Sequence, residues 1–226
     1  MVSGRSSLST QPPARPACNR PPGVVMSTQM LDGQFQAGDI SAESETLVLV
    51  DETDLPVGYL SKALCHRGTG VLHRAFSLFI FNHRGELLLQ QRAPSKPLWP
   101  LFWSNSCCSH PRRAETMEAA IHRRLIEELG VRCPMQFLFK FRYQAQFDAT
   151  RAEHELCSVY MGRCSAPLSI NRREILAVRW ICPAALESEM VGGQAERFTP
   201  WFKLEWERIW REHRPVLLAL QPELPF

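Results

Sequence analysis

The segment Trp103-Ser-Asn-Ser-Cys-Cys-Ser-His-Pro111 stands directly before a charged helical pattern over residues 115–129. Because successive side chains of an extended backbone alternate between two faces, we expect Cys108 and His110 to share one face. A thiol and a possible metal ligand on one face indicate a chemical site, provided that other segments supply its partners. The opposite face would carry Cys107 and Ser109.

The composition predicts one catalytic domain that is soluble. The chain has 226 residues, of which 45% are hydrophobic and 22% charged, as in an ordinary globular protein. The net charge of +3 is too small, and the arginines are too scattered, to indicate nucleic-acid binding. No apolar run approaches the roughly 18 to 20 residues of a membrane span. We expect no nucleic acid and no membrane span; the oligomeric state stays open, with a monomer favoured.

The eight cysteines do not form the pattern of a disulfide framework. Their spacings are irregular, the chain is not short, and its beginning lacks the basic, apolar and small-residue regions of a signal peptide. No CxxC or HExxH motif occurs, which removes the commonest signatures of zinc sites. We therefore expect reduced thiols in a cytoplasmic protein.

Residues 1–44 are rich in Ser, Pro, Gly, Gln and Arg and contain almost nothing to bury. We expect a disordered extension there, followed by one domain over residues 45–226. Arginine and serine without an acidic residue before Asp32 are also typical of organelle transit peptides, so targeting stays open. The favoured alternative is an untargeted tail, or an upstream start ahead of Met26 or Met30.

Strand-like runs occur throughout the domain. Residues 72–81 and 86–92 are expected to pair as a hairpin, with Gly85 at its turn. Alternation of apolar and polar residues also predicts a strand at 137–147. The remaining expected strands are 46–50, 57–59, 153–164 and 175–181.

Two helices are expected beside these strands. Residues 115–129 repeat apolar side chains every four positions, and Gly130 stands where such a helix ends. Thr199 is expected to cap a second helix with Pro200 in its first turn, and that helix should stop before Pro215. The chain is therefore an α/β (α+β) mixture of hairpins and helices in a single domain, without repeats.

Two glutamates and three histidines suggest a metal site. Glu153 and Glu155 share one face of the predicted strand, where two like charges repel unless a cation or a proton lies between them. The alternative is a solvated strand edge. His66 and His73 flank a glycine-containing loop, and with His110 they complete a donor set suited to a transition ion or to Mg²⁺.

Cations and aromatic residues have two interpretations each. Arg92, Lys96 and Lys62 are either solvated or gathered around a diphosphate. Tyr143 and Trp201 are core or rim aromatics, although an indole face can also stabilise a carbocation. In the helix, surface ion pairs are the simple interpretation of two neighbouring i,i+4 pairs: Arg123 with Glu127 and Arg124 with Glu128.

Seven blocks of the sequence follow one another at compatible spacings. Over residues 46–213 the chain resembles, through these blocks, the type I isopentenyl diphosphate isomerases of the Nudix superfamily. The resemblance implies a Nudix-type mixed β-sheet sandwiched between helices. The blocks are His66 and His73 ahead of Ala75-Phe76, Gln91-Arg92-Ala93 with Ser95-Lys96, Trp103 to Pro111, Glu127-Glu-Leu-Gly130, Tyr143, Glu153-His-Glu155 and Thr199-Pro-Trp201.

The helix departs from the Nudix signature at one important position. Arg124 stands where a Nudix hydrolase normally has a metal-binding glutamate after the first arginine. A cation there should impair hydrolysis and add a phosphate contact, which favours an isomerase. Ser109 and Leu101 also stand where glycine is usual, and we interpret both as local backbone variations.

By this resemblance, the protein interconverts isopentenyl diphosphate and dimethylallyl diphosphate by a 1,3-allylic proton shift. Protonation of an unactivated alkene gives a tertiary carbocation, so the site needs an acid, a base on the other side, and no water. Cys108 and Glu155 resemble that pair, and either one is a candidate for the first donor. Tyr143 would assist Glu155, and Trp201 would cover the cationic carbon.

The same resemblance implies two metal sites and a diphosphate site. One divalent ion (Mg²⁺, Mn²⁺ or Zn²⁺) would be held by His66, His73, His110, Glu153 and Glu155. A second ion, Mg²⁺, would bridge the diphosphate near Glu128 and the backbone of Cys108. The implied diphosphate contacts are Lys62, Arg92, Lys96, Ser109 and Arg124.

Two other functions are compatible with fewer of these features. A Nudix hydrolase acting on a diphosphate would use the same fold and cations. A metal-stabilised binding module would use the histidines and glutamates without any turnover.

Overall fold

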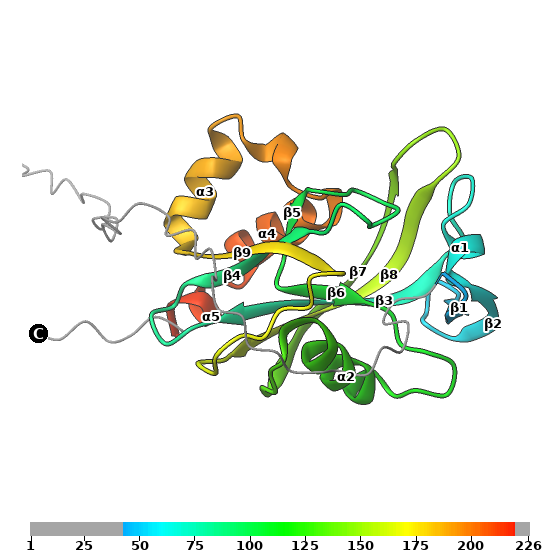
Figure 1. Ribbon diagram of the computed structural model, residues 1–226, viewed down its shortest axis with the longest axis horizontal. Coiled ribbons are helices and arrows are strands. Elements are labelled where there is room, and N and C mark those ends of the chain that lie inside the picture. Colours follow the sequence, from blue (N-terminus) through cyan, green and yellow to red (C-terminus); the bar gives the residue numbers. More distant parts are fainter. Residues whose placement is uncertain (1–42, 220–226) are drawn as a thin grey trace, which may run out of the picture.

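The computed structural model describes residues 43–219, which form a mixed β-sheet with helices on both faces (Figure 1). Apart from its last two residues, the predicted extension over residues 1–44 lies outside the described residues. Within residues 43–219 the sheet has nine strands. They are β1 Thr46–Val50, β2 Pro56–Ser61, β3 His73–Phe81, β4 Leu87–Arg92, β5 Trp103–Ser104, β6 Cys107–Ser109, β7 Met135–Gln146, β8 Ala152–Arg163 and β9 Ile175–Ile181.

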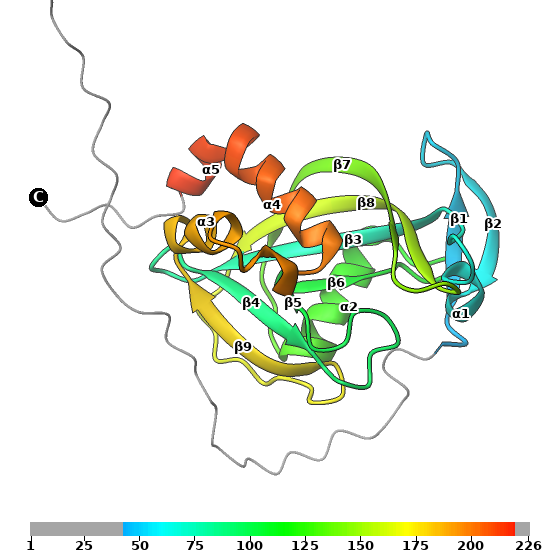
Figure 2. The same ribbon diagram turned by 90° about the horizontal axis from the view of Figure 1, so that it is seen from above.

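The helices lie above and below this sheet. Figure 2 shows α4 and α5 over the strands β7, β8 and β3, and in Figure 1 α2 lies on the other side of β3. None of the helices among residues 43–219 combines the length and the apolar character of a transmembrane segment. The helices are α1 Lys62–Cys65, α2 Met117–Leu129, α3 Pro183–Val191, η1 Ala195–Arg197, α4 Pro200–Glu212 and α5 Arg214–Ala219.

The predicted elements are confirmed to within a few residues, and the misses are short. The α3 helix was not expected because its nine residues carry no clear apolar stripe. The strands β5 and β6 have two and three residues, too few to show a period. The predicted helix after Thr199 stops at Glu212 as expected, and Pro215 lies in the first turn of a separate helix, α5.

Strand β3 divides the core in two, because its side chains alternate between the faces of the sheet. Phe76, Leu78 and Ile80 pack in one cluster with the apolar face of α2. Phe79 and Phe81 pack in the other with the aromatic residues of α4. Burial of both faces explains why this strand is almost continuously apolar in sequence.

The register of three central strands collects residues that are distant in sequence. Strand β8 pairs parallel to β3 and sets Glu155 opposite His73. Strand β6 pairs antiparallel on the other side of β3 and sets Cys108 opposite Ser77. Since directly paired residues share a face, these four side chains lie on the α4 side of the sheet.

Helix α2 is closed at both ends by local interactions. The Thr116 hydroxyl accepts a hydrogen bond from the backbone N–H of Ala119 at 3.2 Å. At the other end, Gly130 adopts φ +68°, and its N–H donates to the carbonyl of Ile126 at 3.0 Å. A Cβ atom on Gly130 would lie 2.7 Å from Cβ of Ser169.

We expect Gly130→Ala to destabilise the protein more than Gly68→Ala, measured as the free energy of unfolding in urea. The two glycines have nearly the same φ, +68° and +65°, but nothing lies within 4 Å of the Cβ position at Gly68. Both variants should lose about 1 kcal/mol because of the left-handed backbone. Gly130→Ala should lose about 1 to 3 kcal/mol more because of the contact with Ser169. Equal losses would show that this contact relaxes without cost.

Candidate active site

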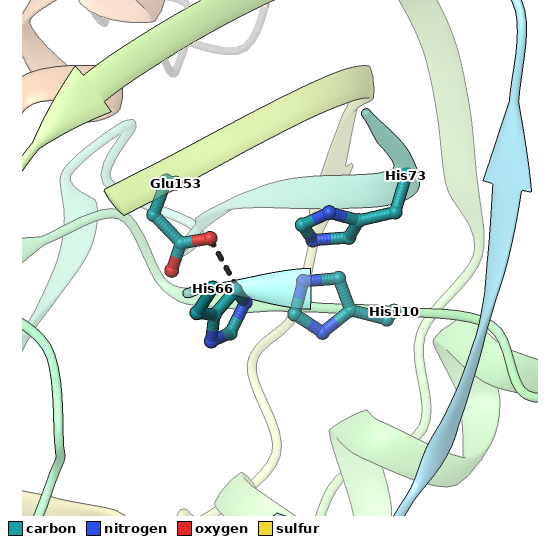
Figure 3. A group of neighbouring side chains, drawn as sticks. All are labelled: His66, His73, His110 and Glu153. Carbon is teal, nitrogen blue, oxygen red and sulfur yellow. Dashed lines mark ion pairs between the residues drawn. The ribbon is translucent and has the colours of Figure 1, made fainter. Parts of the chain in front are cut away.

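Four buried side chains from different elements converge on one point (Figure 3). His66 caps the end of α1, His73 begins β3, His110 follows β6, and Glu153 lies near the start of β8. Each offers one nitrogen or oxygen atom, and these atoms all lie within 4.8 Å of one another. The Nε2 of His66 is 3.1 Å from Oε2 of Glu153. Such a group of imidazoles and a carboxylate has the chemistry of a divalent metal site.

The hydrogen bonding of this cluster also fits a metal. Both ring nitrogens of His66, Nε2 of His73 and Oε2 of Glu153 are buried without a hydrogen-bond partner. The Nδ1 of His73 lies 2.7 Å from the carbonyl of Val71, which leaves Nε2 directed into the cluster. Buried polar atoms are costly when left unpaired. One ion would satisfy a ring nitrogen of His66, Nε2 of His73 and Oε2 of Glu153 together, and the other ring nitrogen of His66 would need a separate partner.

The charge states of these groups suit the same interpretation. Burial lowers the pKa of His73 to about 4 and holds the pKa of His110 well below its usual value, so both are neutral at pH 7. A neutral imidazole is the form that binds a metal. The pKa of Glu153 is held far below its usual value: burial opposes this shift, and the neighbouring His66 outweighs it.

Glu155 lies beside the four-residue cluster and connects it to an aromatic residue. Its Oε1 lies 3.0 Å from Nε2 of His110 and 3.8 Å from Nε2 of His73. Its Oε2 accepts a hydrogen bond from the hydroxyl of Tyr143 at 2.8 Å. Burial, then the charge of Glu153, raises the pKa of Glu155 to about 7. A carboxyl group with that pKa can give or take a proton near neutral pH.

Cys108 borders the same cavity as His110 and Glu155. Alternation correctly separated Cys108 from Cys107, but it was wrong for Ser109, which also lines the cavity because strand β6 ends at that residue. The Sγ of Cys108 lies 3.9 Å from Nη1 of Arg92. Burial raises the pKa of Cys108 to about 12, which keeps the group a thiol at neutral pH. Cys107 is fully buried on the opposite side, in the cluster with α2.

Aromatic side chains close the cavity. Trp201 is buried at the start of α4 and donates from Nε1 to Oδ1 of Asn105 at 3.3 Å. The ring of Trp99 packs edge-on against it, with 5.3 Å between centroids. Tyr143 and Trp201 therefore belong to the core and line the cavity at once, so the two interpretations of these residues are compatible.

The cavity also has a cationic wall. All five residues predicted to contact a diphosphate line it: Lys62, Arg92, Lys96, Ser109 and Arg124. Arg92 donates from Nε to the carbonyl of Trp99 at 3.0 Å and from Nη2 to the carbonyl of Leu98 at 2.8 Å, which fixes its guanidinium. The arrangement joins a cationic part to a part with proton-transfer groups and aromatic rings.

The interpretation of Arg124 and Glu128 as a surface ion pair is wrong. Each residue is only 1% exposed, and Nε of Arg124 donates to Oε1 of Glu128 at 3.1 Å. The Nη2 of Arg124 also donates to Oε1 of Glu174 at 3.2 Å. Spacing on a helix predicted the pair correctly but could not show that strands cover it. By contrast, Arg123 and Glu127 pair at 3.1 Å and are partly exposed.

Two further buried acidic residues were not predicted from the sequence. Glu174 precedes β9 in a charged segment that is typical of a solvated loop, yet it is buried. Glu205 is fully buried on α4, where it accepts from Sγ of Cys157 at 3.6 Å while Oε2 has no hydrogen-bond partner. Its position four residues after Trp201, within the apolar stripe of α4, was the available signal.

Comparison with known proteins identifies the family. The NUDIX domain model matches residues 71–202. The chain is 43% identical over 171 residues to the isopentenyl-diphosphate Delta-isomerase 1 of Photorhabdus laumondii, covering 75% of this chain and 97% of that protein. It is 35% identical over 205 residues to the isopentenyl-diphosphate delta-isomerase of Gibberella zeae, covering 81% and 80%. The chain belongs to the isopentenyl-diphosphate isomerase family of NUDIX-domain proteins.

Solved structures agree on the fold of this isomerase-family protein. A Deinococcus radiodurans crystal structure matches with a TM-score of 0.61 and 26% identity, covering 74% of this chain and 100% of that one. The MutT protein of Methanosarcina mazei matches with a TM-score of 0.53 at 17% identity, covering 63% and 96%, which shows a shared fold. The predicted Nudix-type mixed sheet is therefore confirmed.

A divalent ion should stabilise the wild-type protein through the histidine cluster. At a metal concentration about 100 times Kd, the free energy of unfolding should rise by about 2 to 3 kcal/mol. His110→Ala should lose this gain, because it removes one ligand. His154→Ala should retain it, because His154 is half-buried on the opposite face of β8. Urea denaturation with and without Mn²⁺ or Zn²⁺ measures the gain, and its survival in His110→Ala would contradict the assignment.

Glu205→Gln should stabilise the protein increasingly as pH rises from 5 to 8. Burial raises the pKa of Glu205 to about 8, so above pH 4.5 the unfolded chain releases a proton that the native protein keeps. Wild-type stability is therefore lost as pH rises, by up to about 1.4 kcal/mol per pH unit from this group, and glutamine removes that loss. The control is Glu207→Gln on the same helix, whose side chain is 69% exposed. A flat difference for Glu205→Gln would contradict the expected protonation.

Proposed function

We propose that this protein interconverts isopentenyl diphosphate and dimethylallyl diphosphate by protonation and deprotonation across its cavity. The observation that carries the proposal is the placement of Cys108 and Glu155 in one cavity with Trp201, next to a cationic wall. Sequence identity of 34–43% to relatives named as isopentenyl-diphosphate isomerases supports the same reaction.

In the proposed mechanism, Cys108 and Glu155 are the acid and base. One of them gives a proton to the terminal alkene carbon, which leaves a tertiary carbocation, and the other removes a proton from the carbon next to the diphosphate-bearing carbon. The raised pKa of Cys108 keeps its proton available at neutral pH. Glu155 borders the same cavity, and the hydroxyl of Tyr143 donates to its Oε2, so Glu155 would exchange the second proton there.

The aromatic residues protect the cation in this proposal. Trp201 would place its indole face towards the positive carbon, because the ring quadrupole attracts positive charge. Its hydrogen bond to Asn105 and its contact with Trp99 fix the ring. Tyr143 would hold Glu155 in position through the 2.8 Å hydrogen bond and assist its proton transfer. Buried aromatic walls also exclude water, which would otherwise capture the carbocation.

We also propose the assignment of metals and diphosphate contacts. His66, His73, His110, Glu153 and Glu155 would hold one divalent ion, Mg²⁺, Mn²⁺ or Zn²⁺. When bound, that ion would neutralise the adjacent carboxylates and lower the pKa of Glu155. Mg²⁺ would accompany the diphosphate near Glu128 and the backbone of Cys108. The diphosphate contacts would be Lys62, Arg92, Lys96, Ser109 and Arg124, whose charges complement phosphate oxygens.

The Arg124 position argues against a diphosphate hydrolase. Its buried guanidinium occupies the place of a metal-binding carboxylate in the hydrolase signature, and it binds Glu128 directly.

A cytoplasmic location and a monomeric state remain predictions from the sequence.

Purified protein with Mg²⁺ should convert isopentenyl diphosphate to its allylic isomer. Cys108→Ala should lower kcat by at least about 100-fold, because it removes a proton-transfer group. Cys107→Ala is the matched control and should keep most of the turnover, because Cys107 faces the other core. Product can be followed by NMR in deuterated water, together with an assay for released phosphate.

Three outcomes separate the candidate functions. Release of phosphate without isomerisation would support a Nudix hydrolase. Metal stabilisation without any turnover would support a binding module. Equal losses in Cys108→Ala and Cys107→Ala, with both variants folded, would refute the assignment of Cys108 by its face.

A further inference from the structure

Glu174 occupies a tight turn that is attached to the end of α2. Its N–H donates to the carbonyl of Asn171 at 3.0 Å, and the N–H of Asn171 donates to the carbonyl of Glu128 at 2.9 Å. The side chain of Glu174 is only 4% exposed. The backbone thus holds a charged side chain in the interior beside the helix that carries Arg124.

The Glu174 carboxylate connects two cations from different parts of the chain. Oε1 accepts from Nη2 of Arg124 at 3.2 Å, and Oε2 pairs with Nζ of Lys96. The main chain makes the same link, because the carbonyl of Glu174 accepts from the N–H of Ala93 at 3.0 Å. One residue therefore fixes the turn that carries Lys96 against the helix that carries Arg124.

The cavity lies on the other side of these cations. Lys96 and Arg124 line it, whereas Glu174 does not. A carboxylate that competed with a ligand for these two cations would have to lie inside the cavity, where the ligand binds. Glu174 instead contacts the cations from behind and offsets their mutual repulsion, to which Lys62 also contributes.

We propose that Glu174 is a positioning residue that holds Lys96 and Arg124 in place for the substrate's diphosphate. The inference rests on the proposed function, since it concerns the same cavity. It adds a residue that has no direct contact with the substrate and acts through the two cations. Diphosphate binds in both the ground state and the transition state, so loss of this support should act mainly on KM.

The first test is Glu174→Gln, which keeps the size of the side chain and removes its charge. KM for isopentenyl diphosphate should rise about tenfold, the loss expected when a charge-assisted contact weakens. The value of kcat should stay within about twofold. The dissociation constant for inorganic pyrophosphate with Mg²⁺, measured by calorimetry, should rise by a similar factor. Unchanged KM and pyrophosphate affinity would overturn the proposal.

A double-mutant cycle tests whether Glu174 acts through Lys96. Lys96→Gln alone should also raise KM. The combined variant should raise KM by less than the product of the two single effects, because Glu174 loses one of its targets. If KM of the combined variant rises by the full product of the two single effects, the role of Glu174 in positioning Lys96 is overturned.

The control is Glu189→Gln, which breaks a partly buried ion pair elsewhere. Glu189 accepts from Nη1 of Arg179 at 2.9 Å, and neither residue lines the cavity. Glu189→Gln should lower the melting temperature without changing KM. If Glu174→Gln does not fold, Glu174→Asp is the deciding variant. Its shorter side chain keeps the charge but no longer reaches both cations. An unchanged KM in Glu174→Asp would overturn the proposal. A wild type without isomerase activity would instead refute the proposed function.

Discussion

The pairing of β3 with β8 and β6 is the constraint on which the site depends. The parallel register places Glu155 against His73, and the antiparallel register on the other side places Cys108 against Ser77. Each pair shares a face, so Cys108 and Glu155, which lie on opposite sides of β3, open into one cavity without any long loop to position them. Backbone hydrogen bonds hold the sheet interior rigid, and the side chains on these strands are positioned by that rigid frame.

Most charged groups of the site lie next to a group that compensates or binds them. The ionised Glu153 pairs with His66, whose pKa is raised because the charge of Glu153 outweighs burial, and the partly protonated Glu155 is bound by Tyr143. In the cationic part, Arg124 is enclosed by buried carboxylates. An uncompensated charge in such surroundings would cost several kcal/mol. The two parts share one cavity but balance their charges separately, so a ligand can bridge them with a charged end and an apolar end.

Local patterns in the sequence predicted most of the fold, whereas most residues of the cavity were predicted through the resemblance to a family. Periodicity predicted β7 and α2, apolar runs between turn residues predicted β3 and β8, and alternation placed Cys108 apart from Cys107. Interactions between distant segments were the part that local patterns could not predict. Glu174 pairs with Lys96 across 78 residues, and nothing in its own segment distinguishes it from a solvated loop residue. The burial of Arg124 likewise involves a contact with Glu174, which lies 50 residues later in the chain.

The division of the core by β3 restricts how relatives of this chain can diverge in length. Its odd-numbered positions, from His73 to Phe81, face α4 and the cavity, and its even-numbered positions face α2. A single inserted or deleted residue in this strand would exchange the two faces, placing imidazole in an apolar core and phenylalanine among carboxylates. Evolutionary changes of length should therefore be confined to connections between strands that are not tied to the site, such as residues 165–168.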